Sequence, residues 1–209
     1  MRTITFFNKK GGTGCTKLTH DLAHWIAQAH DAKVAIVHFT GIDGPFSDTP
    51  DIPYYFVSRE RKNSDHETYM NFIKNILPKI INTDYLFIDI PKNSNEGLFE
   101  AFIEGPIPIF TIIPTDNDYM TISCTEEVVN YLKEKGMKYC VLINNVYPKE
   151  EIYTRKELLS RRILAFDSGI LRLDTDINQC PFHLSKETVL ELLYMKINAT
   201  RVKAGKIFY

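Results

Sequence analysis

The chain has 209 residues, with 25 basic and 26 acidic side chains among them. A chain of this length can bury a sizeable core, since a domain of about 150 residues already hides roughly two-thirds of its unfolded surface. The balance of charge excludes a whole-chain electrostatic attraction to nucleic acid or to an anionic membrane, so such binding would need a local basic patch.

The N-terminal part of the sequence alternates strand and helix patterns. Residues 3–7 form a short β-rich run, and residues 16–30 follow with apolar side chains at helical spacing. A β-branched apolar run at residues 34–39 predicts a second strand. Residues 40–65 are rich in Gly, Pro, Asp and Ser, which predicts a loop with little regular structure. Helical spacing returns at residues 67–81.

The same alternation continues through the middle of the chain. Residues 85–90 predict a buried strand, and residues 96–103 predict a short helix. Residues 107–113, between two prolines, predict another strand. An amphipathic helix is predicted over residues 122–135, because the next residue is a glycine that can end it. Residues 140–143 predict a further strand.

The last predicted elements are helices at residues 156–163 and 186–198, the second of them beginning after Ser185 as a natural N-cap. Strands that are apolar on both faces and separated by helices indicate a mainly parallel sheet covered on both sides. We therefore expect an α/β fold, a three-layer sandwich formed by residues 1–209 as a single domain.

Cysteine usage and the N-terminal sequence bear on the compartment. The four cysteines show no C-x-x-C pair, which favours a reducing environment over a disulfide framework. The chain shows no secretory signal pattern and no apolar run long enough to span a bilayer. We expect a soluble cytoplasmic protein with no transmembrane association.

A glycine-rich run lies between the first predicted strand and the first predicted helix. This strand–loop–helix context is the one in which G-x-x-x-x-G-K-[ST] loops hold phosphates, through backbone N–H groups and a lysine. The helix N-terminus adds unpaired N–H groups and a positive dipole end. In this chain Cys15 occupies the lysine position. The predicted phosphate-binding residues are Gly11, Gly12, Thr13, Gly14, Cys15, Thr16 and Lys17.

Residues 7–16, F-N-K-K-G-G-T-G-C-T, resemble the deviant Walker A box, K-G-G-x-G-K-[ST], of the ParA/MinD family of P-loop ATPases. In that family the early lysine reaches across a nucleotide-sandwich dimer to the partner's phosphates, and Lys10 matches that position. The run D-Y-L-F-I-D-I-P at residues 84–91 looks like the Walker B strand. The resemblance implies that Asp89 assists a Mg²⁺ ion and that Thr16 is its direct ligand.

Further segments extend this resemblance over most of the chain. Residues 142–146, L-I-N-N-V, are similar to the strand whose asparagine contacts adenine, which makes Asn144 the candidate. Residues 114–121 match the segment before the family's dimer-face helix. The length fits the small plasmid-partition ATPases that lack an N-terminal DNA-reading domain. The resemblance thus implies ATP or ADP with Mg²⁺, a homodimer, and a centromere-binding-type partner protein in DNA segregation.

Non-specific DNA binding is a further implication, because small ParA-like proteins use basic residues late in the chain for it. Clustered Lys and Arg suffice to neutralise phosphates without reading the base sequence. A solvated helix surface explains the same residues equally well. The candidates are Arg155, Lys156, Arg161, Arg162, Lys196, Arg201, Lys203 and Lys206.

Two departures from the family pattern bear on catalysis. Cys15 replaces the second lysine of the loop, and His38 stands where the family has the first aspartate of D-x-D-P-Q, which positions the attacking water. Phosphoryl transfer relies on positioning and charge neutralisation, and losing one preorganised electrostatic group can cost ~10²–10³-fold in rate. We expect weak or defective ATP hydrolysis, and whether the protein is an ATPase stays open. His38 is either a substitute base or a structural histidine with satisfied hydrogen bonds.

Two other patterns suggest chemistry and have plainer explanations. Cys15 at a helix N-terminus would have a lowered thiol pKa and would serve as a redox sensor, or it is an inert residue that fills the lysine's place. A C-x₅-R phosphatase is excluded because Asp21 occupies the arginine position. His20 and His24 share a helical face as zinc ligands do, but no third ligand is suggested nearby, so exposed histidines are the better explanation.

The sequence leaves two alternatives to a nucleotide-binding partition protein. One is a non-catalytic scaffold with the same fold, in conjugative transfer or polar positioning, that binds no nucleotide. The other is an active small-molecule enzyme of the P-loop class, such as a dethiobiotin-synthetase-like ligase. The missing lysine argues against the ligase, because such an enzyme needs efficient phosphoryl transfer.

Overall fold

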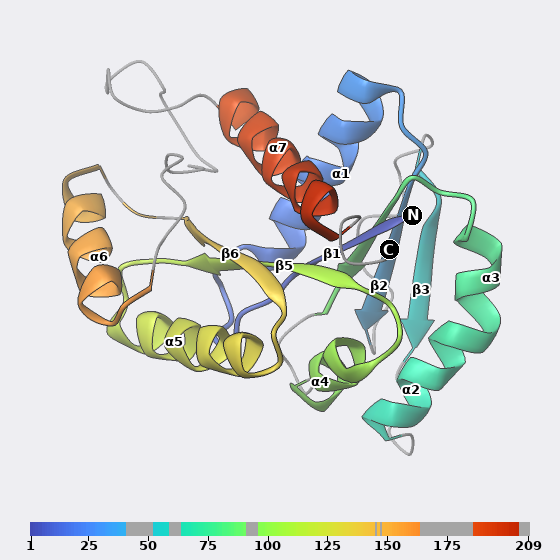
Figure 1. The fold of residues 1–209 in the computed structure, drawn as a ribbon, viewed down its shortest axis with the longest axis horizontal. Helices are drawn as coiled ribbons and strands as arrows, with labels where there is room; N and C mark the ends of the chain where they lie inside the picture. Colours follow the sequence, from blue (N-terminus) through green and yellow to red (C-terminus); the bar gives the residue numbers. More distant parts are fainter. Residues whose placement is uncertain are drawn as a thin grey trace.

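The computed structural model of the chain describes residues 1–40, 52–58, 64–90, 96–144, 146, 148–163 and 186–204. Within these residues six strands form one sheet in the order β3-β2-β4-β1-β5-β6, and every pairing is parallel (Figure 1). The strands are β1 (Arg2–Phe6), β2 (Val34–Thr40), β3 (Tyr54–Ser58), β4 (Tyr85–Asp89), β5 (Ile109–Thr115) and β6 (Lys138–Ile143).

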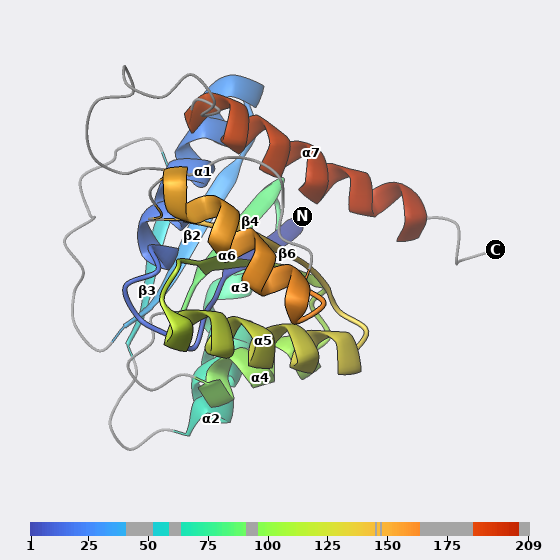
Figure 2. The same cartoon turned by 90° about the vertical axis from the view of Figure 1, so that its left-hand side faces the viewer.

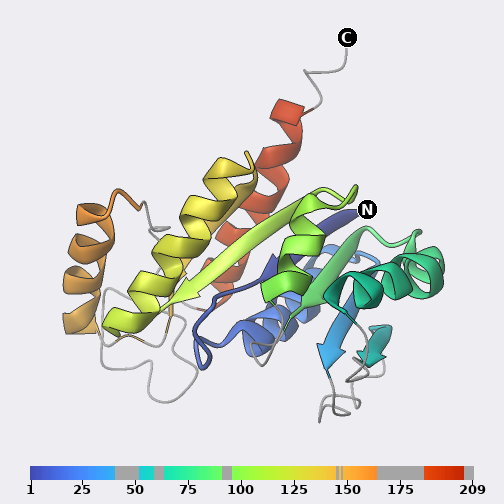
Figure 3. The same ribbon diagram turned by 90° about the horizontal axis from the view of Figure 1, so that it is seen from below.

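Helices cover both faces of the sheet. Helices α1 and α7 lie on one face, and α2, α3, α4 and α5 lie on the other, with α6 beside α5 at the β6 edge (Figures 2 and 3). The helices are α1 (Cys15–His30), α2 (Asp65–Asn71), the π-helical segment η1 (Phe72–Ile76), α3 (Leu77–Ile80), α4 (Glu96–Glu104), α5 (Tyr119–Glu134), α6 (Pro148–Ser160) and α7 (Lys186–Ala204). The expected three-layer α/β architecture is confirmed.

Strands such as β2 contribute to both cores because alternate side chains point to opposite faces of a sheet. In β2, Val34 and Ile36 pack in the core beneath α1 and α7, whereas Ala35 and Val37 pack in the core beneath α4 and α5. Such two-sided burial explains why the strand sequences are continuous apolar runs. The carboxyl ends of these strands meet at one edge, where the glycine-rich run follows β1.

One sequence prediction is wrong, because β3 lies inside the stretch expected to be a loop. Its residues Tyr54–Ser58 pair in parallel with β2 at the edge of the sheet. The Gly- and Pro-rich composition around it hid this aromatic run, and residues 41–51 and 59–63 of the predicted loop lie outside the described residues.

The remaining helix predictions differ from the structure mainly in their bounds. The run predicted at residues 67–81 is continuous helix with a π-helical segment, η1, which ends just before the turn that contains Pro78. Proline has no N–H to donate, and such wide turns form where the regular hydrogen-bond ladder is interrupted. Helix α6 begins at Pro148, earlier than predicted. Ser185, the predicted N-cap of α7, lies outside the described residues.

No helix in the described part of the chain combines the length and the apolar character needed to cross a bilayer.

Candidate functional site

The glycine-rich loop joins β1 to α1 at the carboxyl edge of the sheet. Gly12 and Gly14 have φ angles of 85° and 89°, in the left-handed region that glycine adopts without steric cost. Gly14 is the N-cap of α1, and no side chain caps the helix there. The first N–H groups of α1 are therefore open to an anion, and the helix dipole favours one.

Asn8 holds the start of this loop in place. This residue is 3% exposed, and its Nδ2 donates to the Pro114 carbonyl and to the Thr125 hydroxyl, both at 2.8 Å. Its Oδ1 accepts a hydrogen bond from the backbone N–H of Lys10 at 3.0 Å. Asn8 thus joins the loop to β5 and α5. The sequence reasoning missed it, and its only signal was a polar residue directly after a buried strand.

Asn144 holds the far side of the loop. It is fully buried at the end of β6, and its Nδ2 donates to the Thr13 carbonyl at 2.8 Å. Its backbone N–H donates to the Thr115 carbonyl at 2.7 Å, while its side-chain Oδ1 has no hydrogen-bond partner. In this arrangement Asn144 positions the loop. The predicted adenine contact would require the side chain to be uncovered.

Cys15 is the first residue of α1, and its surroundings favour the inert residue over the redox-sensing thiol, the two alternatives raised by the sequence. Its Sγ lies 3.5 Å from the Thr13 hydroxyl, and burial raises the pKa of the thiol to about 12. Desolvation is the largest cause of this rise, and it acts against the lowering of the thiol pKa that the N-terminus of a helix would give. The thiol stays protonated and neutral near neutral pH, as an inert residue in the lysine's place would.

The lysines around the loop differ in their partners. Lys9 forms ion pairs with Glu96 at 3.3 Å and with Glu127 at 3.1 Å, so it ties the loop to α4 and α5. Lys10 is half-buried, and among the described residues no acidic side chain pairs with its ammonium group. Lys17 is exposed on the first turn of α1. Lys10 and Lys17 are thus the loop's candidates for contacting phosphates.

The expected magnesium residues, Thr16 and Asp89, lie together as predicted. The Thr16 hydroxyl donates to Asp89 Oδ1 at 3.2 Å, and Asp89 is fully buried at the end of β4. His38, the register partner of Asp89 on β2, lies with its Nδ1 only 2.6 Å from Asp89 Oδ2. This contact is compatible with both possibilities raised by the sequence, a substitute base and a structural histidine.

The Thr16 hydroxyl and the Asp89 carboxylate are oxygen donors of the kind that a magnesium ion uses. Magnesium prefers oxygen ligands at near-octahedral positions and usually uses one or two carboxylates together with substrate phosphates. Asp89 Oδ1 faces the Thr16 hydroxyl, and Asp89 Oδ2 lies against the His38 ring, so these residues would hold the ion from the Oδ1 side. At the His38 position β2 presents an imidazole ring and no carboxylate.

His20 and His24 do not form a metal site. His20 is buried, contrary to the sequence expectation, and its Nε2 lies 2.6 Å from the Tyr54 hydroxyl of β3. Burial lowers the pKa of the His20 ring, which favours its neutral form. The part of the chain that the structure describes contains no group of three or more His, Cys, Asp or Glu side chains able to hold a metal ion.

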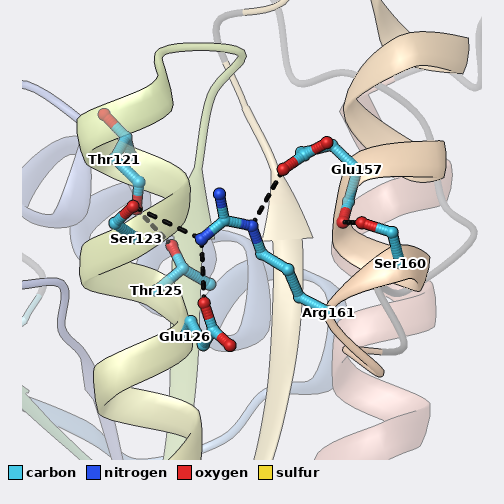
Figure 4. A network of polar contacts seen from close by, with 7 residues as sticks. All are labelled: Thr121, Ser123, Thr125, Glu126, Glu157, Ser160 and Arg161. Carbon is cyan, nitrogen blue, oxygen red and sulfur yellow. Dashed lines mark hydrogen bonds and ion pairs between the residues drawn. The ribbon is translucent and has the colours of Figure 1, made fainter.

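One member of the predicted basic patch, Arg161, is held within the fold. The Arg161 guanidinium forms ion pairs with Glu126 of α5 at 2.8 Å and with Glu157 of α6 at 2.9 Å (Figure 4). It also lies 5.2 Å from the centroid of the Tyr119 ring. Arg161 therefore joins two helices and is not available to DNA without breaking these contacts.

The other basic candidates belong to two regions. Helix α6 buries Leu158 in the core shared with α5, whereas α7 buries Leu193 in the core shared with α1. The two helices are therefore anchored in different cores, on opposite faces of the sheet. The side chains of Arg201, Lys203 and Lys206 lie outside the described residues.

These features define a P-loop NTPase fold. The sheet is parallel, its first strand leads through a glycine loop into a helix, and the Thr16 and Asp89 side chains face each other beside that loop. Solved structures identify the type. A putative plasmid partition protein from Borrelia burgdorferi B31 bound to AMPPNP is 14% identical, with a TM-score of 0.61 over 97% of this chain and 98% of that one.

Cell-division proteins share the same fold. The septum site-determining protein MinD from Pyrococcus horikoshii, complexed with Mg-ADP, is 16% identical, with a TM-score of 0.55 over 83% of this chain and 82% of that one. MinD in the MinC:MinD complex from Aquifex aeolicus is 16% identical, with a TM-score of 0.60 over 83% and 82%. No family model and no curated protein matches the sequence. The chain has the fold of the ParA/MinD-type P-loop ATPases.

Proposed function

We propose that this protein is a ParA-like nucleotide-binding protein that acts in DNA partition or positioning in the cytoplasm and hydrolyses ATP weakly or not at all. The observation that carries the proposal is the glycine loop, whose left-handed Gly12 and Gly14 precede an uncapped helix N-terminus. The structures of like fold that hold AMPPNP and Mg-ADP support nucleotide as the ligand.

Backbone N–H groups of residues 11–16 would hold the phosphates, and Lys17 would add charge at the first turn of α1. Lys10 would reach the phosphates of the partner subunit in a homodimer, which is the role its place in the loop implies. Asn144 would act by keeping Thr13 in position. A centromere-binding-type partner and non-specific DNA complete the proposed assembly, and the MinC:MinD complex supports partner binding by this fold.

Weak hydrolysis follows from two side chains. The neutral Cys15 thiol supplies no charge to the β- and γ-phosphates, and His38 is bonded to Asp89 instead of presenting a carboxylate to the attacking water. Each missing electrostatic group costs about 10²–10³-fold in rate in comparable cases. The same neutral Cys15 favours the second candidate, a scaffold of this fold that binds no nucleotide.

Nucleotide binding separates these two candidates. A ligand that binds only the folded state raises the melting temperature, so ATP or ADP should stabilise the wild-type protein. The Cys15→Lys variant should bind ATP more tightly and hydrolyse it at least about 10²-fold faster. Cys15→Ala is the matched control, because it is small and neutral and should change neither property.

The possible results divide the candidates clearly. Stabilisation of the wild-type protein by nucleotide supports the proposal, and its absence even at saturating ATP favours the scaffold. If Cys15→Lys gains neither affinity nor turnover, the missing lysine is not what limits the site.

A further inference from the structure

One cavity of the molecule lies away from the glycine loop. It has a volume of about 660 Å³ and opens at the amino ends of β1, β5 and β6, where Arg2, Ile109 and Lys138 begin these strands and line it. The glycine loop follows the carboxyl end of β1, and Figure 3 shows the two ends of this strand at opposite edges of the sheet. Cavities of this size hold small molecules in other proteins. The cavity is therefore a candidate binding site separate from the candidate nucleotide site.

The walls of the cavity are mainly apolar. Ile103 of α4, Phe110 of β5 and Ile197 of α7 are buried core residues that line it. Half-buried Ile107 and Met137, from the links into β5 and β6, line it as well. Contact with these side chains would remove a hydrocarbon chain from water, which favours binding.

Glycine and proline residues leave this cavity open. The links into β5 and β6 contribute Gly105, Pro106, Pro108 and Gly136 to its lining, and none of these residues has a long side chain to fill it. A Cβ atom built at Gly136 would meet no atom within 4 Å, so the space beside this residue is open. Proline also fixes the φ angle of the backbone, so this wall is preorganised and binding has a lower entropy cost.

The charged side chains that line the cavity are both cationic. Arg2 and Lys138 lie on the two strands that flank β5, and no Asp or Glu is among the lining residues. Strand alternation places Arg2 on the same face as Ile4, and Lys138 on the same face as Cys140. Both faces belong to the core beneath α7. An anionic head group would therefore meet two cations on one side of the cavity.

Arg2 has hydrogen-bonding capacity left for such a ligand. Its Nη1 donates to the Tyr85 hydroxyl at 2.8 Å, and its Cζ lies 5.5 Å from the centroid of the Tyr85 ring, so Tyr85 restrains the side chain. The Nε of Arg2 is buried and has no hydrogen-bond partner in the described part of the chain. A guanidinium has five N–H donors in a planar fork that matches a carboxylate. A buried donor without a partner is costly, and an anion beside Arg2 would offset that cost.

We propose that this cavity binds a single-chain aliphatic carboxylate, with the carboxylate at Arg2 and Lys138 and the chain against Ile107 and Met137. An aliphatic chain fits the lining, because Phe110 is the aromatic residue among side chains that are otherwise Ile, Met and Pro on the apolar walls. This site is separate from the nucleotide binding proposed above and does not depend on it.

The direct test is isothermal titration calorimetry of the whole chain with octanoate. The wild-type protein should bind octanoate with a Kd below about 1 mM. Octanol, which has the same chain without the charge, should bind at least about tenfold more weakly. Lys138→Glu should weaken octanoate binding at least about fivefold, because it replaces an attractive charge with a repulsive one. Lys133→Glu is the matched control, since Lys133 is exposed on α5 outside the cavity, and it should bind as the wild type does.

Filling the cavity provides a second readout. Ile107→Trp should abolish octanoate binding, whereas Ile81→Trp should not, because Ile81 is 60% exposed and lies outside the cavity. An excess of a fluorescent ATP analogue, mant-ATP, should leave the octanoate affinity unchanged, because the glycine loop is at the other edge of the sheet. Should Ile107→Trp fail to fold, octanol and Lys138→Glu decide the matter without it.

Several results would overturn this inference. They are a wild-type Kd for octanoate above about 1 mM, equal affinities for octanoate and octanol, and losses of equal size in Lys138→Glu and Lys133→Glu. Octanoate binding by folded Ile107→Trp would overturn it as well. Displacement of octanoate by mant-ATP would do the same, because it would place octanoate at the glycine loop. None of these results decides whether the protein binds nucleotide, which is measured separately by mant-ATP binding without octanoate.

Discussion

Replacing Asn8 with alanine should destabilise the whole fold and disorganise the glycine loop. Asn8 makes three hydrogen bonds, to the Pro114 carbonyl, the Thr125 hydroxyl and the Lys10 backbone N–H, and it is 3% exposed. A buried hydrogen bond contributes about 1 kcal/mol net, so Asn8→Ala should lower the free energy of unfolding by about 3 kcal/mol. For a domain of this size that lowers Tm by roughly 6–12 °C.

The measurement is urea and thermal unfolding of Asn8→Ala, with mant-ATP binding as the functional readout. Asn130→Ala is the matched control, because Asn130 is exposed on α5 and its replacement should change stability by no more than about 0.5 kcal/mol. Affinity for mant-ATP should fall for Asn8→Ala under conditions where the variant is still folded. A stability loss below about 1 kcal/mol would refute the reasoning, since it would mean that water or backbone relaxation replaces these bonds.

Two further predictions concern charge. Arg161→Ala should lower the free energy of unfolding, measured by urea unfolding, by about 1–2 kcal/mol in low salt and by less in ~1 M NaCl, because Glu126 and Glu157 lose a partly screened partner. Equal losses at both salt concentrations would argue against the ion pairs. DNA binding by this variant should be unaffected. For His20, burial lowers the pKa of the ring in the folded state below its ordinary value, so the unfolded state binds the extra proton. The contribution of the neutral His20 ring to stability is complete above the unfolded-state pKa and is lost as the pH falls below that pKa. The midpoint of urea unfolding should therefore drop less between pH 8 and pH ~5 in His20→Gln than in the wild type.

The parts of the fold encoded by local patterns could be predicted from the sequence. The loop between β1 and α1 could be predicted because the spacing of its glycines directly after an apolar run indicates a turn that glycine adopts most easily. Most strands could be predicted because a strand buried on both faces is an unbroken apolar run. Strand β3 was not predicted, because it is a short aromatic run within a sequence rich in Gly and Pro, which is typical of a loop.

The parts decided by contacts between distant residues could not be predicted. His38 and Asp89 are 51 positions apart, and they meet only because β2 and β4 are neighbours in the sheet. The direction of the Cys15 pKa shift depended on the competition between helix dipole and burial, and burial cannot be measured from a sequence. The Arg161 ion pairs likewise require α5 and α6 to lie side by side.

The hydrogen bonds of the glycine loop have a consequence for the speed and cost of recognition. Asn8 follows β1, Asn144 follows β6 and Asp89 ends β4, so residues anchored in one rigid sheet hold the loop at its start, middle and end. The conformational entropy of the loop is therefore lost once, when the chain folds, and not again at each encounter with a ligand. The loop should therefore act as a preorganised binding site, and the association rate of a ligand should be limited by diffusion and charge more than by rearrangement of the backbone.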